Sequence, residues 1–256
     1  MRVVSLLAMF PRWLALGLSL FGAQALAGYA PIPDGYVLLS TDTTNRYVVA
    51  GGARFFIPPA QWSNYSSATL VPLPQATINS YAEIPQEGTL LRQIGYAAIY
   101  VVVGEKFWWI PNPTELDYWD DWRTVNNIPN AGWSEVFYNY SYKILVQERT
   151  RSQIYLYIAG AKYPITNASD LAYYGGASSV KIVPMGTLDD NTDQPWCGAL
   201  LRERSSSTVY SLGFINSSLP GMYRSPVTAT ADGEVPDGAL SGIPVFTPGG
   251  FLNCIN

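Results

Sequence analysis

GTLLRQIGYAAIYVVVGEKFWWIPNPTELDYWDDWRTVNNIP, residues 88–129, is the stretch of the chain that decides its fold. It contains three short runs of β-branched or aromatic residues bounded by Gly, Pro or Asn, which is the pattern of β-strands. These runs are Thr89–Arg92, Ile99–Val103 and Phe107–Ile110. Between the second and third runs, Gly104 and Glu105 predict a tight hairpin turn, because such turns need residues that accept a positive φ. A short helix within Pro113–Trp122 and a fourth strand at Val125–Ile128 complete the expected unit.

This unit recurs along the chain, and a tyrosine at the start of its second strand marks each copy. The tyrosines are Tyr47, Tyr100, Tyr155 and Tyr210, at spacings of 53, 55 and 55 residues. The first strand recurs at Gly35–Leu39, Lys143–Val146 and Gly198–Arg202. The third strand recurs at Arg54–Pro58 and Lys162–Ile165. In the fourth copy the third strand is reduced to Gly213–Ile215. The chain therefore holds four repeats of about 54 residues. Their expected bounds are about 32–83, 84–135, 136–192 and 193–256, in one domain that spans 28–256.

Two proline-containing motifs mark the ends of the units. An apolar residue followed by proline is expected to end the fourth strand at Val71-Pro72, Ile128-Pro129 and Val183-Pro184. Near the C-terminus, Val235–Leu240 (VPDGAL) repeats the opening Ile32–Val37 (IPDGYV). This echo predicts that a partial fifth unit begins at Val235.

Four-stranded units of this length are typical of the blades of β-propellers, whose last blade is often completed by the opposite end of the chain. We therefore expect an all-β fold, a small four- or five-bladed β-propeller. A β-trefoil-like arrangement is the alternative, with three units as its core and the divergent fourth as an extension. An open solenoid ranks third, because its terminal repeats would need polar caps.

Residues 1–27 have the pattern of a secretory signal peptide. Arg2 lies in a charged start, Trp13–Leu20 is an apolar run, and Ala25-Leu26-Ala27 matches a cleavage site. A retained membrane anchor would need about twenty apolar residues, whereas Arg12 interrupts this stretch. We expect cleavage before Gly28 and a secreted chain, extracellular or periplasmic, with no membrane span left.

Cys197 and Cys254 are the only cysteines, and both belong to the exported part. In an oxidising compartment an isolated pair is expected to form a disulfide, here between the start of the fourth unit and the C-terminal tail. Such a bond closes a loop of about 57 residues, for which the chain-entropy model gives roughly 4 kcal/mol. Two unpaired thiols are the alternative.

The charge of the chain excludes one class of partner. There are 15 basic and 19 acidic residues, and cleavage of residues 1–27 removes two of the basic ones. Because nucleic-acid binding needs clustered Lys and Arg, no nucleic-acid partner is expected.

The chain contains no histidine, which restricts the chemistry open to it. Ser-His-Asp and Cys-His catalytic systems are excluded, as are His-based zinc and copper sites. Neither a phosphate-binding G-x-x-x-x-G-K-[ST] loop nor a dinucleotide fingerprint occurs. We therefore expect a protein that is not an enzyme and that carries no cofactor.

An acidic cluster lies beside two tryptophans. Asp120 and Asp121 stand between Trp119 and Trp122, where a sugar could stack, and two carboxylates are what a glycosidase needs. A solvated acidic segment near a helix, with its charges favoured by the helix dipole, is the stronger interpretation.

A second group of oxygen-bearing side chains has the spacing of a calcium loop. Asp189, Asn191 and Asp193 alternate as calcium ligands do. The glycine and the final glutamate of that motif are missing, since Gln194 and Leu200 occupy their places. A plain turn between units is therefore favoured over a calcium site.

Alternating tyrosines follow the second unit at Tyr138, Tyr140 and Tyr142. If this run is a strand, its period of two places all three on one face. Exposed aromatic rings with nearby acid groups are a common means of holding a sugar. The predicted ligand-binding set is completed by Trp119, Trp122, Asp120 and Asp121.

Most of the other aromatic residues are expected in the core. Trp108 and Trp109 are adjacent, so in a strand they must point to opposite sides. One of the two is therefore expected to be buried between sheets.

The repeated motifs resemble a known kind of unit. Segments of the form "DGTLLR … VYVV-GGK-WIP-P" look like a repeat of exported bacterial proteins, sometimes found in several copies beside cell-wall or polysaccharide-acting domains. The matching positions are Asp34-Gly35, Gly88–Arg92, Tyr100–Gly104 and Trp109–Pro111, and the resemblance covers about residues 32–215. It implies exported β-repeats and transfers no catalytic residue.

Two hypotheses about function follow. The first is a secreted, non-catalytic module that binds a glycan or cell-envelope polymer through exposed aromatics. The alternative is a structural or protein–protein interaction protein of the cell surface. Exposed tryptophans at equivalent positions of several units would favour the first, and burial of nearly all of them the second. Because the tryptophans are concentrated in unit two, a single site in or beside that unit is the narrower expectation.

Overall fold

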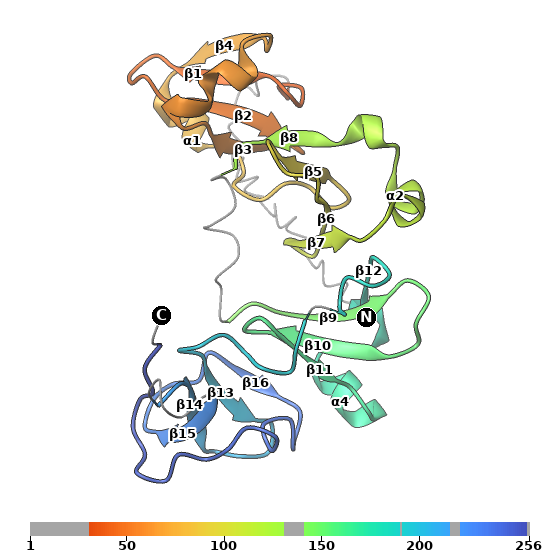
Figure 1. The fold of residues 1–256 in the computed structure, drawn as a ribbon, viewed down its shortest axis with the longest axis vertical. Helices are drawn as coiled ribbons and strands as arrows, with labels where there is room; N and C mark the ends of the chain where they lie inside the picture. The colour runs from red at the N-terminus through yellow and green to blue at the C-terminus, as the bar shows by residue number, and fades with distance from the viewer. Residues whose placement is uncertain (1–30, 131–140, 190, 216–220, 255–256) are drawn as a thin grey trace, which may run out of the picture. The chain divides into compact units, whose positions relative to one another are not determined.

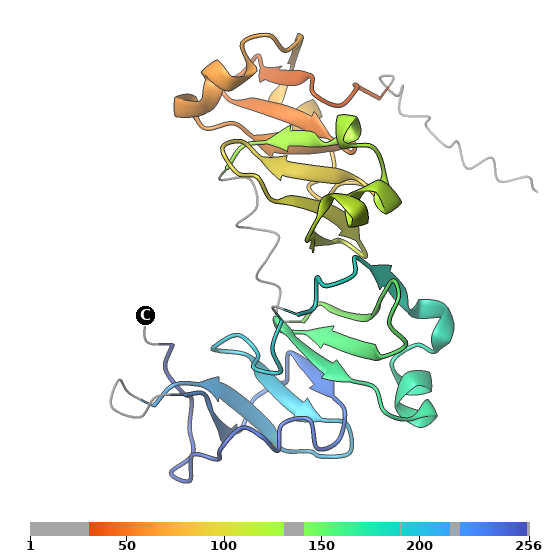
Figure 2. The same cartoon turned by 45° about the vertical axis from the view of Figure 1, so that its right-hand side comes forward.

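Four sheets of four strands each make up the structure (Figure 1 and Figure 2). The computed structural model describes residues 31–130, 141–189, 191–215 and 221–254, and the chain from Ile32 onward forms one unit. The predicted class is confirmed: the fold is all-β, and the repeats form blade-like sheets in a propeller-like arrangement. None of the described sheets closes into the barrel that a trefoil core requires. Within the described residues, no helix has both the length and the apolar composition needed to cross a membrane.

The four sheets have the same strand order. In the first sheet the strands are β1 (Val37–Ser40), β2 (Arg46–Ala50), β3 (Ala53–Phe56) and β4 (Leu70–Leu73). In the second they are β5 (Leu90–Gln93), β6 (Ile99–Val103), β7 (Lys106–Ile110) and β8 (Asn126–Ile128). In the third they are β9 (Lys143–Glu148), β10 (Ile154–Ile158), β11 (Ala161–Pro164) and β12 (Lys181–Val183). In the fourth they are β13 (Leu200–Glu203), β14 (Val209–Gly213), β15 (Tyr223–Val227) and β16 (Gly233–Val235).

Within each sheet the first three strands form an antiparallel meander, and the fourth returns to pair in parallel with the first. The spatial order is therefore third, second, first, fourth in every unit. All four strands come from one continuous stretch of sequence, so none of the described sheets is completed by a strand from the other end of the chain.

A parallel return needs a crossover connection, and short helices supply it. These are η1 (Pro59–Tyr65) in the first unit, α2 (Pro113–Trp119) and η2 (Trp122–Thr124) in the second, and α4 (Ala168–Tyr173) and η3 (Ala177–Ser179) in the third. The predicted helix after Pro111 is thus confirmed. Asn112 and Asn167 cap α2 and α4 in the same way, each accepting a 2.9 Å hydrogen bond from the backbone N–H three residues on.

The repeated tyrosine has the same partners in each unit. Tyr47, Tyr100, Tyr155 and Tyr210 pair with buried first-strand residues, which are Leu38, Leu91, Val146 and Leu201. In three units a cation of the third strand lies over the ring, at 5.5 Å for Arg54, 5.8 Å for Lys162 and 5.0 Å for Arg224. In the second unit Phe107 takes the place of this cation.

The predicted hairpin turn at Gly104 and Glu105 is confirmed, since φ is 55° at the first residue and 62° at the second. The acidic residue before the first-strand glycine stabilises this turn: Glu87 Oε2 accepts a 2.8 Å hydrogen bond from Gly104 N–H. Asp34 makes the corresponding, longer contact to Gly52 N–H at 3.4 Å. The acid–glycine pair of the repeat therefore ties the start of one strand to the turn between the next two.

The ends of the fourth strands differ from the prediction in two units. The equivalent buried residues are Leu73, Ile128, Val183 and Val235, which lie opposite Ser40, Gln93, Glu148 and Glu203. In the first unit the apolar–proline pair is therefore Leu73-Pro74 and not Val71-Pro72. Val235 ends β16, so the echo of the opening sequence completes the fourth sheet at the point where a fifth unit was expected to begin.

The third strand of the fourth unit also lies elsewhere than predicted. Gly213 ends β14, and Phe214 makes an isolated antiparallel bridge to Asn253. The third strand is β15, which lies further along the chain. The prediction Gly213–Ile215 was wrong because the hairpin loop of this unit is longer than in the others.

Each inner sheet is buried on both faces. On β6, Val102 packs in the cluster shared with the first sheet, whereas Val101 and Val103 pack in the cluster shared with the third. A further cluster joins the third and fourth sheets and contains Leu156 of β10 and Leu212 of β14. Burial on both faces explains why these strands are continuous apolar runs without alternating polar residues.

The first and fourth sheets each have one face that does not pack on a neighbouring sheet, and other segments of the chain pack on these faces. The short helix α1 (Gln75–Asn79) follows β4 and places Ile78, fully buried, in a cluster with Leu38 of the first sheet. On the fourth sheet, Leu252 N–H donates to the hydroxyl of Ser211 at 3.2 Å. The predicted disulfide is confirmed: Cys197 and Cys254 are bonded, with their Cα atoms 5.5 Å apart.

Candidate functional site: an aromatic pocket

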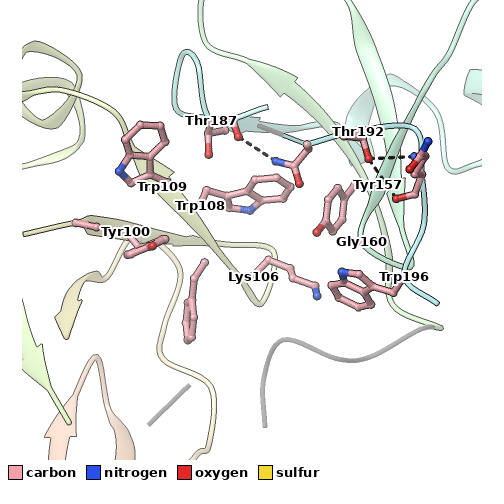
Figure 3. A pocket seen from close by; sticks show the side chains of 13 residues that line it. Tyr100, Lys106, Trp108, Trp109, Tyr157, Gly160, Thr187, Thr192 and Trp196 are labelled. Atoms are coloured by element: carbon pink, nitrogen blue, oxygen red, sulfur yellow. Dashed lines mark hydrogen bonds between the residues drawn. The ribbon is translucent and has the colours of Figure 1, made fainter. Parts of the chain in front are cut away.

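A cavity of about 740 Å³ is formed by residues of the second and third units (Figure 3). It is called the aromatic pocket below. Its lining combines aromatic, hydroxyl and amide side chains with one lysine. The lining residues are Ala98, Tyr100, Lys106, Phe107, Trp108, Trp109, Tyr157, Gly160, Thr187, Asn191, Thr192, Gln194 and Trp196.

The two adjacent tryptophans of β7 have different roles. Trp108 is buried, its Nε1 donates to the carbonyl of Val103 at 3.0 Å, and its ring meets that of Tyr157 edge to face at 5.1 Å. Trp109 is half-buried and lies opposite Tyr100 on the neighbouring strand β6. The prediction that one of the pair is core is therefore confirmed for Trp108; both rings border the cavity, and that of Trp109 keeps more exposed surface.

The segment 187–196 supplies the polar side of the pocket. The buried carboxylate of Glu148 holds its start, because Oε1 accepts hydrogen bonds from the N–H groups of Gly186 and Leu188, both at 2.9 Å. Its middle is tied to β11, where Lys162 N–H donates to the carbonyl of Thr192 at 2.9 Å. These anchors position Thr192 and its neighbour Gln194 at the cavity with their side chains exposed.

Trp196 reaches the pocket because a glycine makes room for it. The backbone N–H of Trp196 donates to the carbonyl of Ala159 at 2.7 Å, in the turn between β10 and β11. Its ring covers Gly160, where a Cβ atom would lie 2.2 Å from ring atoms. Gly160 also has a φ of +82°, which other residues rarely adopt. Any side chain at position 160 would therefore displace Trp196.

Lys106 is enclosed by aromatic rings. It is only 6% exposed, and its Nζ lies 5.1 Å from the ring centre of Tyr142, 5.8 Å from that of Tyr157 and 5.2 Å from that of Trp196. Figure 3 shows the lysine extending toward Tyr157 and Trp196. Burial lowers the pKa of Lys106 to about 8. Burial raises the pKa of Tyr157 to about 12, so at neutral pH the group combines an ammonium with an uncharged phenol.

The predicted ligand-binding set is not assembled in one place. Trp119 is half-buried, and its Nε1 donates to the carboxylate of Glu115 at 3.2 Å. Trp122 is 68% exposed and lies outside the lining of the aromatic pocket. Asp120 and Asp121 are exposed and accept hydrogen bonds from nearby backbone N–H groups, at 2.7 Å and 2.9 Å. The side chain of Trp119 is therefore fixed by its hydrogen bond to Glu115, while that of Trp122 is exposed on the surface outside the pocket.

The predicted face of three tyrosines is only partly within the described residues. Tyr138 and Tyr140 lie outside them, and Tyr142 precedes β9 instead of lying in a strand. Its ring faces Lys106. Burial, together with the charges of Glu105 and Glu87, raises the pKa of Tyr142.

One carboxylate of the calcium candidate, that of Asp189, is bound by an arginine. Asp189 receives two hydrogen bonds from Arg151, at 2.8 Å and 3.3 Å, and the hydrogen bond to Arg151 lowers the pKa of Asp189. Asn191 turns its amide toward the carbonyl of Thr187 at 3.0 Å, and Asp193 is exposed. No group of three acidic or cysteine side chains that could hold a metal occurs in the described part of the chain. The described residues of the segment lie between β12 and β13, with Asp189 bound to Arg151.

The sequence predicts a site in or beside the second unit, and the aromatic pocket is lined by other residues of that unit and of the third. In the sequence Tyr100 marks a repeat, Trp109 belongs to an expected strand, and Lys106 directly precedes that strand. Trp196 lies far from them in the sequence, and its contribution depends on the second and third units lying side by side. The available signal was the adjacent pair Trp108-Trp109, because two neighbouring strand residues point to opposite faces of a sheet and their rings therefore meet different surroundings.

No family model, curated protein or solved structure matches the chain. The interpretation of the aromatic pocket therefore rests on its own geometry. That geometry joins flat aromatic faces, neutral hydrogen-bonding groups and one ammonium in a cavity of the size that small ligands occupy.

Proposed function

We propose that the chain is an exported, non-catalytic binding protein that holds a glycan in the aromatic pocket. The observation that carries this proposal is the set of three half-buried aromatic residues on the cavity wall, Tyr100, Trp109 and Trp196. Trp108, which also borders the cavity, is by contrast only 4% exposed. These three keep exposed surface in a concave site.

The polar lining supports a sugar as the ligand. A sugar ring has an apolar C–H face that packs on an aromatic ring, and hydroxyl groups at its edge that exchange hydrogen bonds with amides and hydroxyls. Thr187, Asn191, Thr192 and Gln194 supply such groups along one side of the pocket. A volume of about 740 Å³ falls within the range of ligand-binding cavities.

Export is supported by two features. Residues 1–27 have the three-part pattern of a signal peptide. The disulfide between Cys197 and Cys254 is compatible with an oxidising compartment outside the cytoplasm. The partner class that fits both is a glycan or polymer of a cell wall, capsule or extracellular matrix.

The proposal is tested with a glycan array probed with the oxidised protein, followed by tryptophan fluorescence titration of each hit. Trp109→Ala is expected to abolish binding, because it removes the half-buried ring opposite Tyr100. Trp122→Ala is the matched control, since Trp122 is an exposed tryptophan of the same unit outside the pocket. Equal effects of the two variants would place the site elsewhere. A protein that binds no glycan would instead have the structural or protein-binding role, which a pull-down from cell envelopes would then examine.

A further inference from the structure

A second, smaller cavity lies beside the aromatic pocket, and its lining is chemically different. It has a volume of about 370 Å³ and is called the apolar groove below. Eight of the nine described residues that line it are Ala, Ile, Pro, Leu or Trp, and the ninth is Asn112. The aromatic pocket, by contrast, is lined by hydroxyl and amide side chains as well as by rings.

The groove lies at the open end of the β6–β7 hairpin. Ile99 and Ile110 form the last pair of this hairpin, and α2 begins at Pro113, three residues further on. Ile110 packs with Leu116 of α2 in the cluster shared with the third sheet. Trp109 is adjacent to Ile110 in the strand and therefore points to the opposite face. Side chains of both faces thus border the groove where the strands end.

The groove adjoins one end of the aromatic pocket. Trp109 and Ala98 line both cavities. Tyr100 lies opposite Trp109 on β6, and Figure 3 shows these two rings at the end of the pocket away from Trp196. A ligand that packs on Trp109 in the pocket can therefore extend into the groove.

The lining of the groove suits a hydrocarbon chain better than a second sugar ring. A buried hydroxyl group costs free energy unless it finds a hydrogen-bond partner. The one amide in the lining, that of Asn112, already accepts through its oxygen the 2.9 Å hydrogen bond from Glu115 N–H that caps α2. The other lining side chains offer carbon surface, which stabilises a bound chain in proportion to the apolar area that it covers.

The third unit fills the equivalent place with a polar side chain. Ala98 occupies the second position before the repeated tyrosine, where the third unit has Gln153. Gln153 Nε2 donates to the carbonyls of Ile154 and Ile165, at 2.7 Å and 3.1 Å. These two isoleucines form the pair that corresponds to the last pair of the β6–β7 hairpin. An amide therefore lies across this site in the third unit, whereas an alanine leaves it open in the second.

Two further positions distinguish the second unit from the others. The residue opposite the repeated tyrosine is Trp109 in the second unit, and in the first, third and fourth units it is Phe56, Pro164 and Pro226. The residue three positions before that tyrosine is Ala97 in the second unit, and in the others it is Thr44, Ser152 and Ser207. The groove is therefore a feature of the second unit and does not follow from the repeat itself.

We propose that the glycan held in the aromatic pocket carries an alkyl or acyl chain, and that this chain lies in the apolar groove. The inference rests on the proposed glycan-binding function and adds the class of ligand, an amphiphilic glycoside. The neutral side chains of segment 187–196 bind the hydroxyl groups of the sugar, and Trp109 contacts both the sugar and the chain. The chain contributes affinity through the burial of its methylene groups.

The first test varies only the length of the chain on a given sugar. The oxidised protein is titrated by calorimetry with the methyl, butyl, hexyl and octyl β-glycosides of glucose, galactose and N-acetylglucosamine, each below its critical micelle concentration. For at least one sugar, affinity is expected to rise roughly tenfold for every two methylene groups until the groove is full. Because the ligand is changed and not the protein, this comparison does not depend on how a variant folds.

A ligand without a sugar shows whether both parts are needed. Tetraethylene glycol monooctyl ether carries the same chain as the octyl glycosides but no sugar ring. It is expected to bind at least about tenfold more weakly than the preferred octyl glycoside, because it cannot replace the hydrogen bonds that the sugar makes in the aromatic pocket.

Three variants then assign the effect to the groove. Ala98→Gln gives the second unit the side chain that lies across this site in the third, so it is expected to remove the dependence on chain length. Thr208→Gln is the matched control, because it places the same side chain at the equivalent position of the fourth unit, outside the lining of both cavities. It is expected to keep the wild-type dependence. Trp109→Ala is expected to bind neither the methyl nor the octyl glycoside.

The outcomes separate the two proposals. If saccharides bind but chain length has no effect for any of the three sugars, the amphiphilic ligand is overturned and the glycan site stands. If Ala98→Gln keeps the dependence on chain length, the chain does not lie in the groove and the inference fails. If the octyl ether binds as tightly as the octyl glycosides, or if no glycoside binds, the glycan-binding function itself fails, and the inference with it.

Discussion

Arg149 binds both carboxylate oxygens of Glu115, with its Nη2 2.7 Å from Oε2, across the boundary between the second and third units. The Arg149 guanidinium also stacks on Tyr118, 4.3 Å from the ring centre. The same group of an acidic residue, an arginine and a tyrosine recurs 55 residues later as Asp170, Arg204 and Tyr173, where the arginine stacks at the same 4.3 Å. We call each group an inter-unit clamp. The helix of one unit is thereby fixed to the strand end of the next.

Loss of the first inter-unit clamp should destabilise the protein more than loss of a surface ion pair. Glu115 is 3% exposed, so Arg149→Ala leaves a buried carboxylate without its cation and is expected to cost about 3 kcal/mol of unfolding free energy. Arg123→Ala is the control, because Arg123 and Asp121 are 3.8 Å apart and both are largely exposed, so about 0.5 kcal/mol or less is expected. Urea unfolding measures both. Equal losses of unfolding free energy in the two variants would show that the buried ion pair stabilises the protein no more than the exposed one does.

The same carboxylate should make stability depend on acidic pH. Burial alone would raise the pKa of Glu115, but the hydrogen bonds from Arg149, Met185 N–H and Trp119 and the charge of Arg149 outweigh it, so this pKa is lowered. A lowered pKa in the folded state gives stability that is present above the ordinary value near 4.5 and is lost as the pH falls through the folded-state value. In thermal melts, the melting temperature of Glu115→Gln should therefore fall less than that of wild type as the pH is lowered from about 5 to about 3. Parallel curves for the two proteins would contradict this.

Reduction of the disulfide should act on the fourth sheet first. The bond between Cys197 and Cys254 closes a long loop, so its loss is expected to lower the unfolding free energy by roughly 4 kcal/mol. Release of the tail also uncovers Ser211 on β14, so amide exchange should increase in that strand before it does in β6. The double variant Cys197→Ala/Cys254→Ala should not respond to reductant. Uniform exchange in all sheets would mean that the tail does not act as a local cover.

Gly160→Ala should disturb the aromatic pocket beyond the usual penalty for a positive φ. A Cβ atom there meets Trp196 at 2.2 Å, so the tryptophan must move and glycan affinity should fall at least about tenfold. Gly88→Ala is the matched control, since its φ is +83° but no atom lies within 4 Å of the added carbon. Both variants should lose about 1 kcal/mol of stability from the backbone alone. Trp196 fluorescence and ligand titration would separate them, and unchanged binding in Gly160→Ala would remove Trp196 from the site.

The lysine in the aromatic pocket predicts a pH effect on the alkaline side. Burial lowers the pKa of Lys106 to about 8 from 10.5, so keeping the ammonium charged destabilises the folded state below pH 8. This destabilisation is relieved as the pH rises from 8 toward 10.5, because the folded state loses its proton first. Relative to Lys106→Met, wild type should gain thermal stability between pH 7 and pH 9.5. The burial that raises the pKa of Tyr157 to about 12 keeps that phenol neutral over this range. A constant difference in melting temperature would show that Lys106 does not titrate there.

The repeat could be predicted from the sequence because its local signals agree. Tyr100 lies at the start of a strand, Gly104 and Glu105 form the turn, and Pro111 follows the end of the next strand, each for a reason that acts within a few residues. Strand order is less local. That β8 returns to pair in parallel with β5 depends on contacts between segments more than thirty residues apart, which the pattern of apolar residues does not specify.

The site was predicted less well, because a pocket depends on neighbours in space. Trp119 and Trp122 have the same flanking acids in the sequence, yet one is held by Glu115 and the other is exposed. Conversely, Trp196 has no neighbouring signal and enters the pocket only because Gly160 leaves room for its ring. The sequence pattern predicts which residues form a strand or a turn. It does not predict which loop of the next unit contacts them.

The continuous origin of each sheet has an evolutionary consequence. Since no described sheet borrows a strand from elsewhere, a duplicated stretch of 55 residues would encode a complete sheet together with the acid, arginine and tyrosine that join it to its neighbours. The cover helix α1 and the disulfide-linked tail belong to the first and last units and would keep their places. Unequal recombination within the gene can therefore lengthen or shorten such a protein by whole units.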